Sequence, residues 1–383
     1  MRKICAVTGY RSDYTKLKSV LFAIEESSEL ELEVVVFGAH ALGDYGNTVD
    51  SIENDQHNII TTLLTNIEGG NTVAMSKSVG LAVVELSSVL SVSKPDVVLI
   101  VGDRYEIMAA AIASAMNNIP IAHIQGGEVS GTIDEVIRHS ITKLANIHFP
   151  STELSKNRIL QMGENPEFVY NVGCPAIDYI KGKDYLSREE MLSDDWFKTL
   201  GLNFSEDYLI LMQHPVTTMK EDFSETLEAV QSLGIQTIMI YPNPDAGGDS
   251  IVKAERKFSE KYEDDSVIVG KYKNIDFDHY LNLLRHCRCL VGNSSSGIRE
   301  AYVFNTPVVN IGSRQQDRER TANVVDVPCD RNAIENAALT QMNRTIVSDG
   351  FELYGDGLAS ERIVSVLVGA DLIKSLNKRF LML

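Results

Sequence analysis

Short, continuous apolar runs alternate with longer amphipathic segments along the whole chain. The runs are rich in Val and Ile, and they lack the apolar–polar alternation of a strand that has one face in solvent. Strands buried on both faces of a parallel sheet have this pattern. We therefore expect strands at residues 4–8, 32–38, 97–101, 119–124, 147–149, 208–212, 237–241, 267–269, 290–292 and 307–311.

The segments between these runs have helical periodicity, most clearly at residues 13–27, 72–91, 106–116, 133–145 and 277–286. A repeated strand–helix–strand order predicts an α/β protein with doubly wound parallel sheets. Because 383 residues exceed one ordinary core, we expect two Rossmann-like domains that face a central cleft.

The expected domain boundaries follow from a composition change in the middle of the chain. Residues 176–204 are charged, contain the only tryptophan, Trp196, and are interpreted as the junction. The N-terminal domain is then 1–175 and the C-terminal domain 205–364. A final helix, 365–383, is expected to cross back and complete the N-terminal domain.

Composition narrows the class of protein. A formal net charge of −18 makes nucleic acid an unfavourable partner. We expect no signal peptide and no membrane span, because the N-terminal apolar run is short and no run of about twenty apolar residues occurs. Five cysteines without CxxC spacing indicate reduced core thiols in the cytoplasm, and no spacing of His, Cys or Asp indicates a metal site.

Polar turns follow the predicted strands, and ligands of open parallel sheets bind at the carboxyl ends of strands. In VGNSSSGIREA, residues 291–301, the serines Ser294 and Ser295 open a helix, which favours a phosphate at the helix N-terminus. Ordinary serine capping is the alternative. Glu300 could accept from ribose hydroxyls, or lie on a solvated helix face. Arg314 and Arg11 are candidates for a diphosphate clamp, with surface arginines as the alternative.

Acidic side chains gather in the turns of the N-terminal half. Asp103 directly follows an apolar strand, and Glu128 follows two glycines. Asp134 and Arg138 are four residues apart, so they share one helix face. These groups suit acid–base chemistry, although Asp134 and Arg138 are equally well explained as a salt bridge at an acidic helix start.

Two histidines belong to apolar strands or follow them. His214 precedes a proline, which holds it in extended backbone, where it can donate to a phosphate or move a proton. His123 fits a core histidine with a backbone hydrogen bond better than it fits a catalytic group.

These turns resemble a known family. GYRSDYTKL, VVVFGAHALGDYGNT, VGDRYE, HIQGGEVSGTIDEVIRHSITKLA, QHPVTT, YPNPDAG, GNSSSGIREA and NTPVVNIGSRQ are similar, in order and over nearly the whole chain, to the hydrolysing UDP-N-acetylglucosamine 2-epimerases. This family includes bacterial enzymes of sialic-acid pathways and the epimerase half of a bifunctional animal enzyme. The resemblance implies the two-domain architecture called GT-B.

The resemblance also implies a reaction and a set of residues. A base removes the proton at sugar C2, UDP leaves to give a 2-acetamidoglycal, and water adds to give N-acetylmannosamine; no cofactor is expected. Asp103 and Asp134 are the best acid–base candidates, with Glu128, Arg138 and His214 as further catalytic candidates. Positions that match the family's UDP and sugar contacts are Arg11, Asp13, Thr15, His40, Arg104, His214, Asn243, Asp245, Ile275, Ser294, Ser295, Glu300 and Arg314.

One position departs from the family pattern. Animal relatives carry a glutamate where this chain has Gln125, and glutamine cannot transfer a proton as an acid or base. The departure bears on which carboxylate is the base and which sugar is the substrate.

Four alternatives stay open. They are a hydrolysing 2-epimerase of UDP-N,N′-diacetylbacillosamine, a non-hydrolysing 2-epimerase, a GT-B glycosyltransferase and a non-catalytic sensor of sugar nucleotides. The expected partners are a UDP-sugar substrate and further copies of the chain in a homodimer or homotetramer, with no nucleic acid and no membrane.

Overall fold

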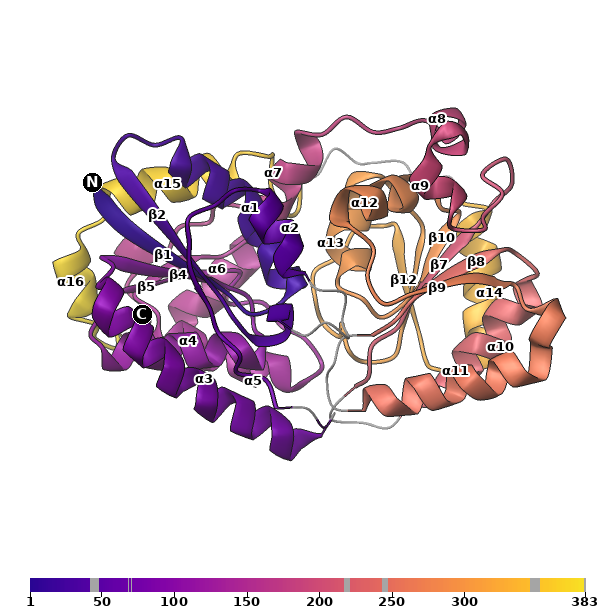
Figure 1. Cartoon of the computed structure of the whole chain (residues 1–383), viewed down its shortest axis with the longest axis horizontal. Coiled ribbons are helices and arrows are strands. Elements are labelled where there is room, and N and C mark those ends of the chain that lie inside the picture. Colours follow the sequence, from indigo (N-terminus) through magenta and orange to yellow (C-terminus); the bar gives the residue numbers. More distant parts are fainter. Residues whose placement is uncertain are drawn as a thin grey trace. The chain divides into compact units, whose positions relative to one another are not determined.

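The computed structural model describes residues 1–41, 48–67, 69, 71–216, 221–242, 247–344 and 352–381. The chain divides into two compact units. Unit 1 comprises Met1–Val129, Ile133–Gly182 and Tyr354–Leu383, and unit 2 comprises Ser130–Thr132 and Lys183–Leu353. Each unit contains one six-stranded parallel sheet with helices packed on it (Figure 1).

The sheet of unit 1, sheet A, has the strand order β3-β2-β1-β4-β5-β6. This is the order of a dinucleotide-binding doubly wound domain, in which the chain reverses direction across the sheet between β1 and β4. The strands are β1 (Arg2–Thr8), β2 (Leu30–Val36), β3 (Ile59–Thr62), β4 (Val97–Val101), β5 (Ile121–Ile124) and β6 (Ile147–Phe149). The helices of this unit are α1 (Arg11–Glu25), η1 (Gly38–Ala41), α2 (Val49–Asn54), α3 (Thr72–Ser93), α4 (Tyr105–Met116), α5 (Ile133–Leu144), α6 (Glu153–Gln161), η3 (Pro166–Phe168), α7 (Pro175–Lys181), α15 (Ala359–Gly369) and α16 (Leu372–Leu376).

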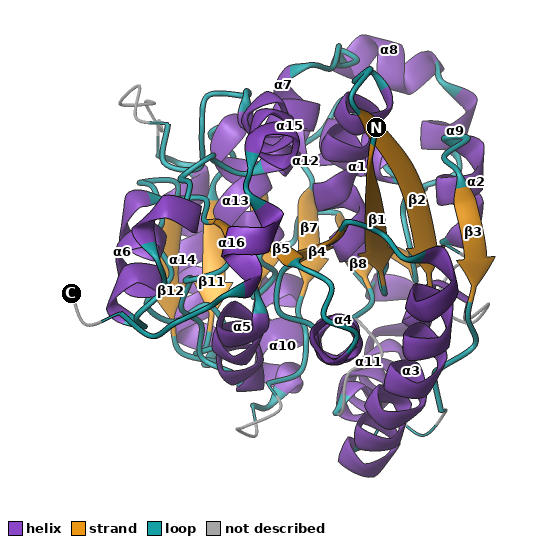
Figure 2. Cartoon of the chain, turned by 90° about the vertical axis from the view of Figure 1, so that its left-hand side faces the viewer, coloured by secondary structure: helices purple, strands orange, loops and turns teal. Residues whose placement is uncertain are grey.

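Alternate residues of the central strands supply two separate cores. In β4, Val97, Leu99 and Val101 join the cluster that includes residues of α1 and α15. Val98 and Ile100 point to the other face and join residues of α3 and α4. Because successive side chains of a strand point to opposite faces, a strand covered on both sides must be apolar throughout. In Figure 2 the strands β3, β2, β1, β4 and β5 of this sheet lie side by side from right to left.

Sheet B of unit 2 repeats the same topology, with the order β12-β11-β10-β7-β8-β9. Read from β9, its reversal point lies between β7 and β10. Its strands are β7 (Leu209–Met212), β8 (Thr237–Ile240), β9 (Ile268–Tyr272), β10 (Cys289–Gly292), β11 (Val308–Ile311) and β12 (Val324–Val327). Its helices are α8 (Arg188–Ser193), α9 (Asp195–Lys198), α10 (Phe223–Leu233), α11 (Gly248–Tyr262), η4 (Glu263–Asp265), α12 (Phe277–His286), α13 (Ser296–Val303) and α14 (Arg331–Met342). The predicted fold class of two doubly wound α/β domains is confirmed.

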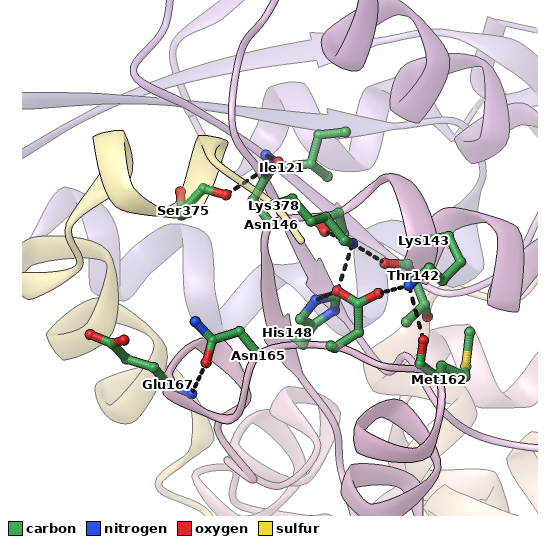
Figure 3. Close-up of polar contacts among 12 residues, drawn as sticks. Ile121, Thr142, Lys143, Asn146, His148, Met162, Asn165, Glu167, Ser375 and Lys378 are labelled. Carbon is green, nitrogen blue, oxygen red and sulfur yellow. Dashed lines mark hydrogen bonds and ion pairs between the residues drawn. The ribbon is translucent and has the colours of Figure 1, made fainter. Parts of the chain in front are cut away.

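A charge network centred on the buried Glu164 binds Lys378 of the C-terminal segment to the rest of unit 1 (Figure 3). Glu164 forms ion pairs with Lys143 at 2.5 Å and Lys378 at 2.6 Å, and its Oε2 lies 3.1 Å from Nε2 of His148. Lys378 also donates to the Thr142 carbonyl at 3.0 Å. The side chain of Glu164 is 2% exposed, so this carboxylate organises charges from β6, α5 and the chain end within the protein interior.

Helix α3 is, within the part of the chain that the structure describes, the one helix long and apolar enough to cross a membrane. Length and composition alone are weak evidence for a span, because covering helices of soluble domains share them. Ala82, Leu86 and Leu90 of α3 pack into the core against sheet A, as expected of a crossover helix.

The five cysteines are all free thiols, and four of them are buried. Burial raises the pKa of Cys5 and of Cys289 to about 12, which keeps both thiols protonated and unreactive. Burial agrees with the prediction of core thiols for four of the five cysteines, and Cys329 is half-buried.

Candidate functional site

The carboxyl end of sheet A places acidic turns beside each other at the reversal point. Strands β1 and β4 are direct neighbours in the sheet, with Ala6 paired to Leu99. The turn after β1 leads to Asp13 in the first turn of α1, and the turn after β4 carries Asp103 and Arg104. Ligands of doubly wound sheets bind at this point.

Asp103 is held by Arg138 from helix α5. Nε of Arg138 donates to Oδ2 of Asp103 at 3.0 Å, and a second nitrogen of the same guanidinium contacts the same oxygen. Nη1 of Arg138 donates to the Glu128 carbonyl at 2.7 Å. Arg138 is 1% exposed, whereas the side chain of Asp103 is 19% exposed. The buried arginine therefore fixes a carboxylate that remains open on one side and ties it to the Glu128 turn.

Arg104 is oriented by its neighbours in the same turn. Its Nε and Nη2 donate to the two oxygens of Glu106 at 3.1 and 3.0 Å, and its guanidinium lies 4.4 Å from the centre of the Tyr10 ring. Glu106 is 2% exposed. The two hydrogen bonds and the stacking on Tyr10 hold the Arg104 cation at the carboxyl end of sheet A, near Asp13.

Two histidines of unit 1, His40 and His123, are buried and hydrogen-bonded to other groups of the protein. Hydrogen bonds of 2.8 Å join the two ring nitrogens of His40 to Thr8 and to Thr48, and burial followed by the nearby Arg104 charge lowers its pKa to about 3. Nε2 of His123 donates to the Gly102 carbonyl at 2.8 Å, and burial lowers its pKa to about 3. The interpretation of His123 as a core histidine is confirmed; the sugar-side role given to His40 stays a prediction.

Gln125 directly follows β5 and has a left-handed backbone conformation, with φ of 65°. Its side chain is buried, and Nε2 donates to Sγ of Cys174 at 3.1 Å. Non-glycine residues with positive φ are uncommon and cluster at functional sites. Gln125 therefore belongs to the set of unusual positions at the carboxyl end of sheet A, and it presents an amide bound to a thiol.

At the carboxyl end of sheet B, the side chain of Asn293 links the turn after β10 to the turn after β7, the two neighbouring strands at the reversal point. Oδ1 of Asn293 accepts from the His214 backbone N–H at 2.7 Å, and its Nδ2 donates to the His214 carbonyl at 2.9 Å. These reciprocal bonds fix the backbone of His214, which follows β7, against the turn after β10. In the sequence, Asn293 is only one residue of the VGNSSSGIREA motif, and nothing there indicates that it fixes the His214 backbone.

The turn after β10 approaches β7 closely. Gly292 has φ of 142°, and a Cβ at this position would lie 2.0 Å from the Met212 carbonyl oxygen. Only glycine fits this approach, which brings the start of α13 beside His214. Glycine here therefore serves the close contact of two strand ends.

Hydroxyl groups surround the start of α13. Ser294 Oγ accepts from the Ser296 N–H at 3.3 Å, and the Ser296 hydroxyl lies 2.5 Å from the Tyr280 hydroxyl. Ser295, at the N-cap position, makes no side-chain capping bond. Ordinary capping therefore does not account for Ser295, which leaves its side chain available to an anion at this helix start.

Arg314 and Gln315 complete the unit 2 arrangement. Nη1 of Arg314 and Nε2 of Gln315 donate to the Asn293 carbonyl at 3.1 and 3.0 Å. Arg314 is half-buried and Glu300, on α13, is buried. A cation thus lies against the turn that opens the serine-rich helix.

The other predicted site residues have various settings. Arg11 lies with its guanidinium 5.5 Å from the Tyr10 ring centre, and the Thr15 hydroxyl donates to the Ser12 carbonyl at 3.3 Å. Ile275 is buried just before α12, and Asp134 is half-buried in the first turn of α5. Asn243 and Asp245 lie outside the described residues. Among the described residues, no group of three or more His, Cys, Asp or Glu side chains could hold a metal ion.

Comparison with known proteins assigns this arrangement to a family. The sequence profile described as UDP-N-acetylglucosamine 2-epimerase matches residues 22–368. The chain is 36% identical over 371 residues to UDP-N,N′-diacetylbacillosamine 2-epimerase (hydrolyzing) of Legionella pneumophila, covering 96% of each chain. It is 37% identical over 331 residues to UDP-N-acetylglucosamine 2-epimerase of Neisseria meningitidis, covering 85% of this chain and 83% of the other.

A solved structure shows the same fold. UDP-GlcNAc 2-epimerase of Methanocaldococcus jannaschii, in complex with UDP-GlcNAc and UDP, superposes with a TM-score of 0.80 at 19% identity, over 95% of this chain and 99% of that one. The chain belongs to the UDP-N-acetylglucosamine 2-epimerase family, and its relatives include hydrolysing members.

Proposed function

We propose that this protein is a hydrolysing 2-epimerase that converts a UDP-linked 2-acetamido sugar and water to the free C2 epimer and UDP. Asp103, fixed by the buried Arg138 at the reversal point of sheet A, is the observation that carries the proposal. A carboxylate held in this way is suited to proton removal at C2, which is the step that distinguishes epimerisation from simple hydrolysis.

The reaction proceeds by elimination and addition. The Asp103 carboxylate takes the proton from C2, the C1–O bond breaks, and UDP leaves with the electron pair to give a 2-acetamidoglycal. Water then adds its oxygen to C1 while a proton is delivered to C2. Because the C2 proton is only weakly acidic, stabilisation of the leaving diphosphate must supply much of the rate.

The residues of unit 2 are assigned to UDP. The start of α13, the serine hydroxyls and Arg314 offer amide, hydroxyl and guanidinium donors, and each suits a diphosphate. His214 is assigned to the same group, since Asn293 fixes its backbone. Glu300 accepts from the ribose hydroxyls. UDP-GlcNAc and UDP, the ligands of the M. jannaschii complex, are molecules of the kind that this set would bind.

UDP-N-acetylglucosamine is the first candidate substrate, and N-acetylmannosamine is then the product, for a sialic-acid-type pathway. The Neisseria relative is named for this substrate. UDP-N,N′-diacetylbacillosamine is the second candidate. It is favoured by the Legionella relative, whose name specifies it and whose similarity covers 96% of both chains. The cytoplasmic location and the homodimer or homotetramer are proposed on the same family grounds.

Product analysis with both sugars separates the candidates. The protein is incubated in parallel with UDP-N-acetylglucosamine and UDP-N,N′-diacetylbacillosamine, and NMR follows the sugar and UDP. The proposal expects a free C2 epimer and UDP from one of the two, with kcat/KM at least about tenfold higher for the true substrate. A C2 epimer that stays attached to UDP would instead identify a non-hydrolysing enzyme.

A further inference from the structure

Asp13 is a buried carboxyl group at the reversal point of sheet A. It lies in the first turn of α1, directly after β1, and is 1% exposed. The Ser12 hydroxyl lies 3.5 Å from its Oδ1, and Oδ2 is buried with no hydrogen-bond partner within the described ranges. A buried carboxylate oxygen without a partner is costly, and a protonated carboxyl that can donate to a bound ligand removes this cost.

The charged groups around Asp13 come from three elements. Arg104 follows β4, Lys16 lies on α1, Glu106 lies on α4, and Asp103 shares the turn of Arg104. Burial is the largest influence and raises the pKa of Asp13 to about 7. Arg104 and Lys16 act against the rise, while Glu106 and Asp103 add to it. Near neutral pH, Asp13 therefore exists in both protonation states.

Asp103 and Asp13 both lie at the carboxyl end of sheet A, but their surroundings differ. Asp103 accepts from the Arg138 guanidinium, a contact that favours the charged form of a carboxyl group. Asp13 lacks such a contact on Oδ2. Two carboxyl groups whose environments differ in this way commonly divide the roles of base and acid in one reaction.

The chemistry of inversion requires a second proton-transfer group. One group removes the C2 proton, and a different group must deliver a proton to the opposite face of C2 when the glycal keeps its orientation. Gln125 carries an amide, which does not transfer a proton as an acid, and this amide is bound to Cys174, so Gln125 cannot serve. Another residue at the carboxyl end of sheet A has to supply the proton that is added to C2.

We propose that Asp13 is the acid that protonates C2 of the 2-acetamidoglycal during water addition, an inference that rests on the proposed function. The Asp13 O–H bond breaks and the C2–H bond forms, while the C1=C2 double bond is lost. The water oxygen bonds to C1, and its proton passes to solvent. The proton taken earlier by Asp103 exchanges with solvent, which returns a proton to Asp13.

The Asp13→Asn variant separates the two halves of the reaction. It keeps the shape and removes the transferable proton, so elimination continues while hydration slows by roughly a hundred- to ten-thousand-fold. With the UDP-sugar that the wild type accepts, the variant is expected to release UDP and accumulate 2-acetamidoglycal. Wild-type enzyme supplied with 2-acetamidoglycal and UDP should form the free sugar, and this rate should fall as pH rises through about 7. The pH dependence should be absent from the residual rate of the variant.

Two further variants keep the test decisive. Asp178→Asn is the matched control, because Asp178 is a partly buried carboxyl of unit 1 whose pKa is also raised, and it accepts from the Ser360 N–H of α15 at 2.6 Å. It should not produce glycal. If Asp13→Asn fails to fold, Asp13→Glu restores the carboxyl and should retain hydration, with its pH dependence.

Formation of free sugar by Asp13→Asn at the wild-type rate would overturn the assignment. Equal loss of UDP release and glycal hydration would overturn it as well, since Asp13 would then act before the glycal forms. A wild-type enzyme that neither releases UDP nor hydrates the glycal would refute the proposed function itself.

Discussion

The two sheets have the same topology, but different kinds of side chain gather at their carboxyl ends. At sheet A, the strand ends supply Asp13, Asp103 and Glu128, and the buried Arg138 contacts the last two. At sheet B, they supply amide, hydroxyl and guanidinium groups arranged around Asn293. Since both sheets follow one strand order, the backbone does not decide the chemistry. The difference supports the proposed division of roles, in which unit 1 transfers protons and unit 2 binds the nucleotide.

The largest expected effect is on turnover, from Asp103→Asn. The substitution preserves shape but removes the base, so kcat should fall by roughly a hundred- to ten-thousand-fold while KM changes little. Asp96→Asn is the control, because Asp96 lies before β4 and accepts from the Lys3 N–H at 2.7 Å, at the opposite end of the same strand. Steady-state kinetics of both variants would contradict the account if Asp96→Asn were the slower one.

A buried carboxylate outside the site should affect stability in place of turnover. Glu164→Gln leaves Lys143, Lys378 and His148 without their shared anion, which should lower the free energy of unfolding by about 3 kcal/mol. Urea unfolding measures this loss. Glu167→Gln, which breaks an exposed pair with Lys374, should cost about 1 kcal/mol or less. The two variants should keep kcat within a few-fold of wild type.

The Glu164 effect should depend on pH with a defined sign. Burial opposes its charge, but the His148 hydrogen bond and the two lysines outweigh burial and lower its pKa to about 2. The folded state therefore holds its proton less tightly than the unfolded state, whose carboxyl titrates near 4.5. The stability difference between wild type and Glu164→Gln should be full above about pH 4.5 and shrink as pH falls toward 2. A constant difference over this range would contradict the assignment.

The smallest expected effect concerns nucleotide affinity. Arg314→Ala removes a charged donor from unit 2, and a hydrogen bond to a charged group contributes about 1.5–3 kcal/mol. The Kd of UDP should therefore rise by roughly ten- to a hundredfold, with kcat changed less. Calorimetric titration measures the affinity. Arg331→Ala, at the start of α14, removes an exposed arginine of the same unit that donates to Ser232, and it should leave the Kd unchanged.

The fold was largely predictable because ten of the strands contain or overlap a short apolar run. Strands β3 and β12 escaped detection, and both are edge strands of their sheets. In β3, half-buried Ile59 and Thr61 alternate with exposed Ile60 and Thr62, and every residue of β12 is at least partly exposed. Because side chains of these two edge strands are partly exposed, their sequences lack the continuous buried apolar run on which the prediction depends.

The turns of the site were predictable, but their pairing was not. Spacing along the helix pointed to Asp134, whose charge acts on Arg138, but it gave no sign that Arg138 also donates to Asp103, 35 residues earlier in the chain. The bond between Gln125 and Cys174 spans 49 residues. Contacts between neighbouring strand ends depend on the order of strands in the sheet, and local spacing carries no record of that order.

Turnover in heavy water tests the central claim most directly. If a carboxylate of unit 1 removes the C2 proton and UDP leaves, the free sugar must carry deuterium at C2, and labelled water oxygen must be found at C1 and absent from UDP. We expect complete deuterium incorporation at C2 together with one UDP released per sugar. A free sugar that retains its original C2 proton would contradict the account, because hydrolysis would then proceed without the proton transfer that Asp103 is assigned.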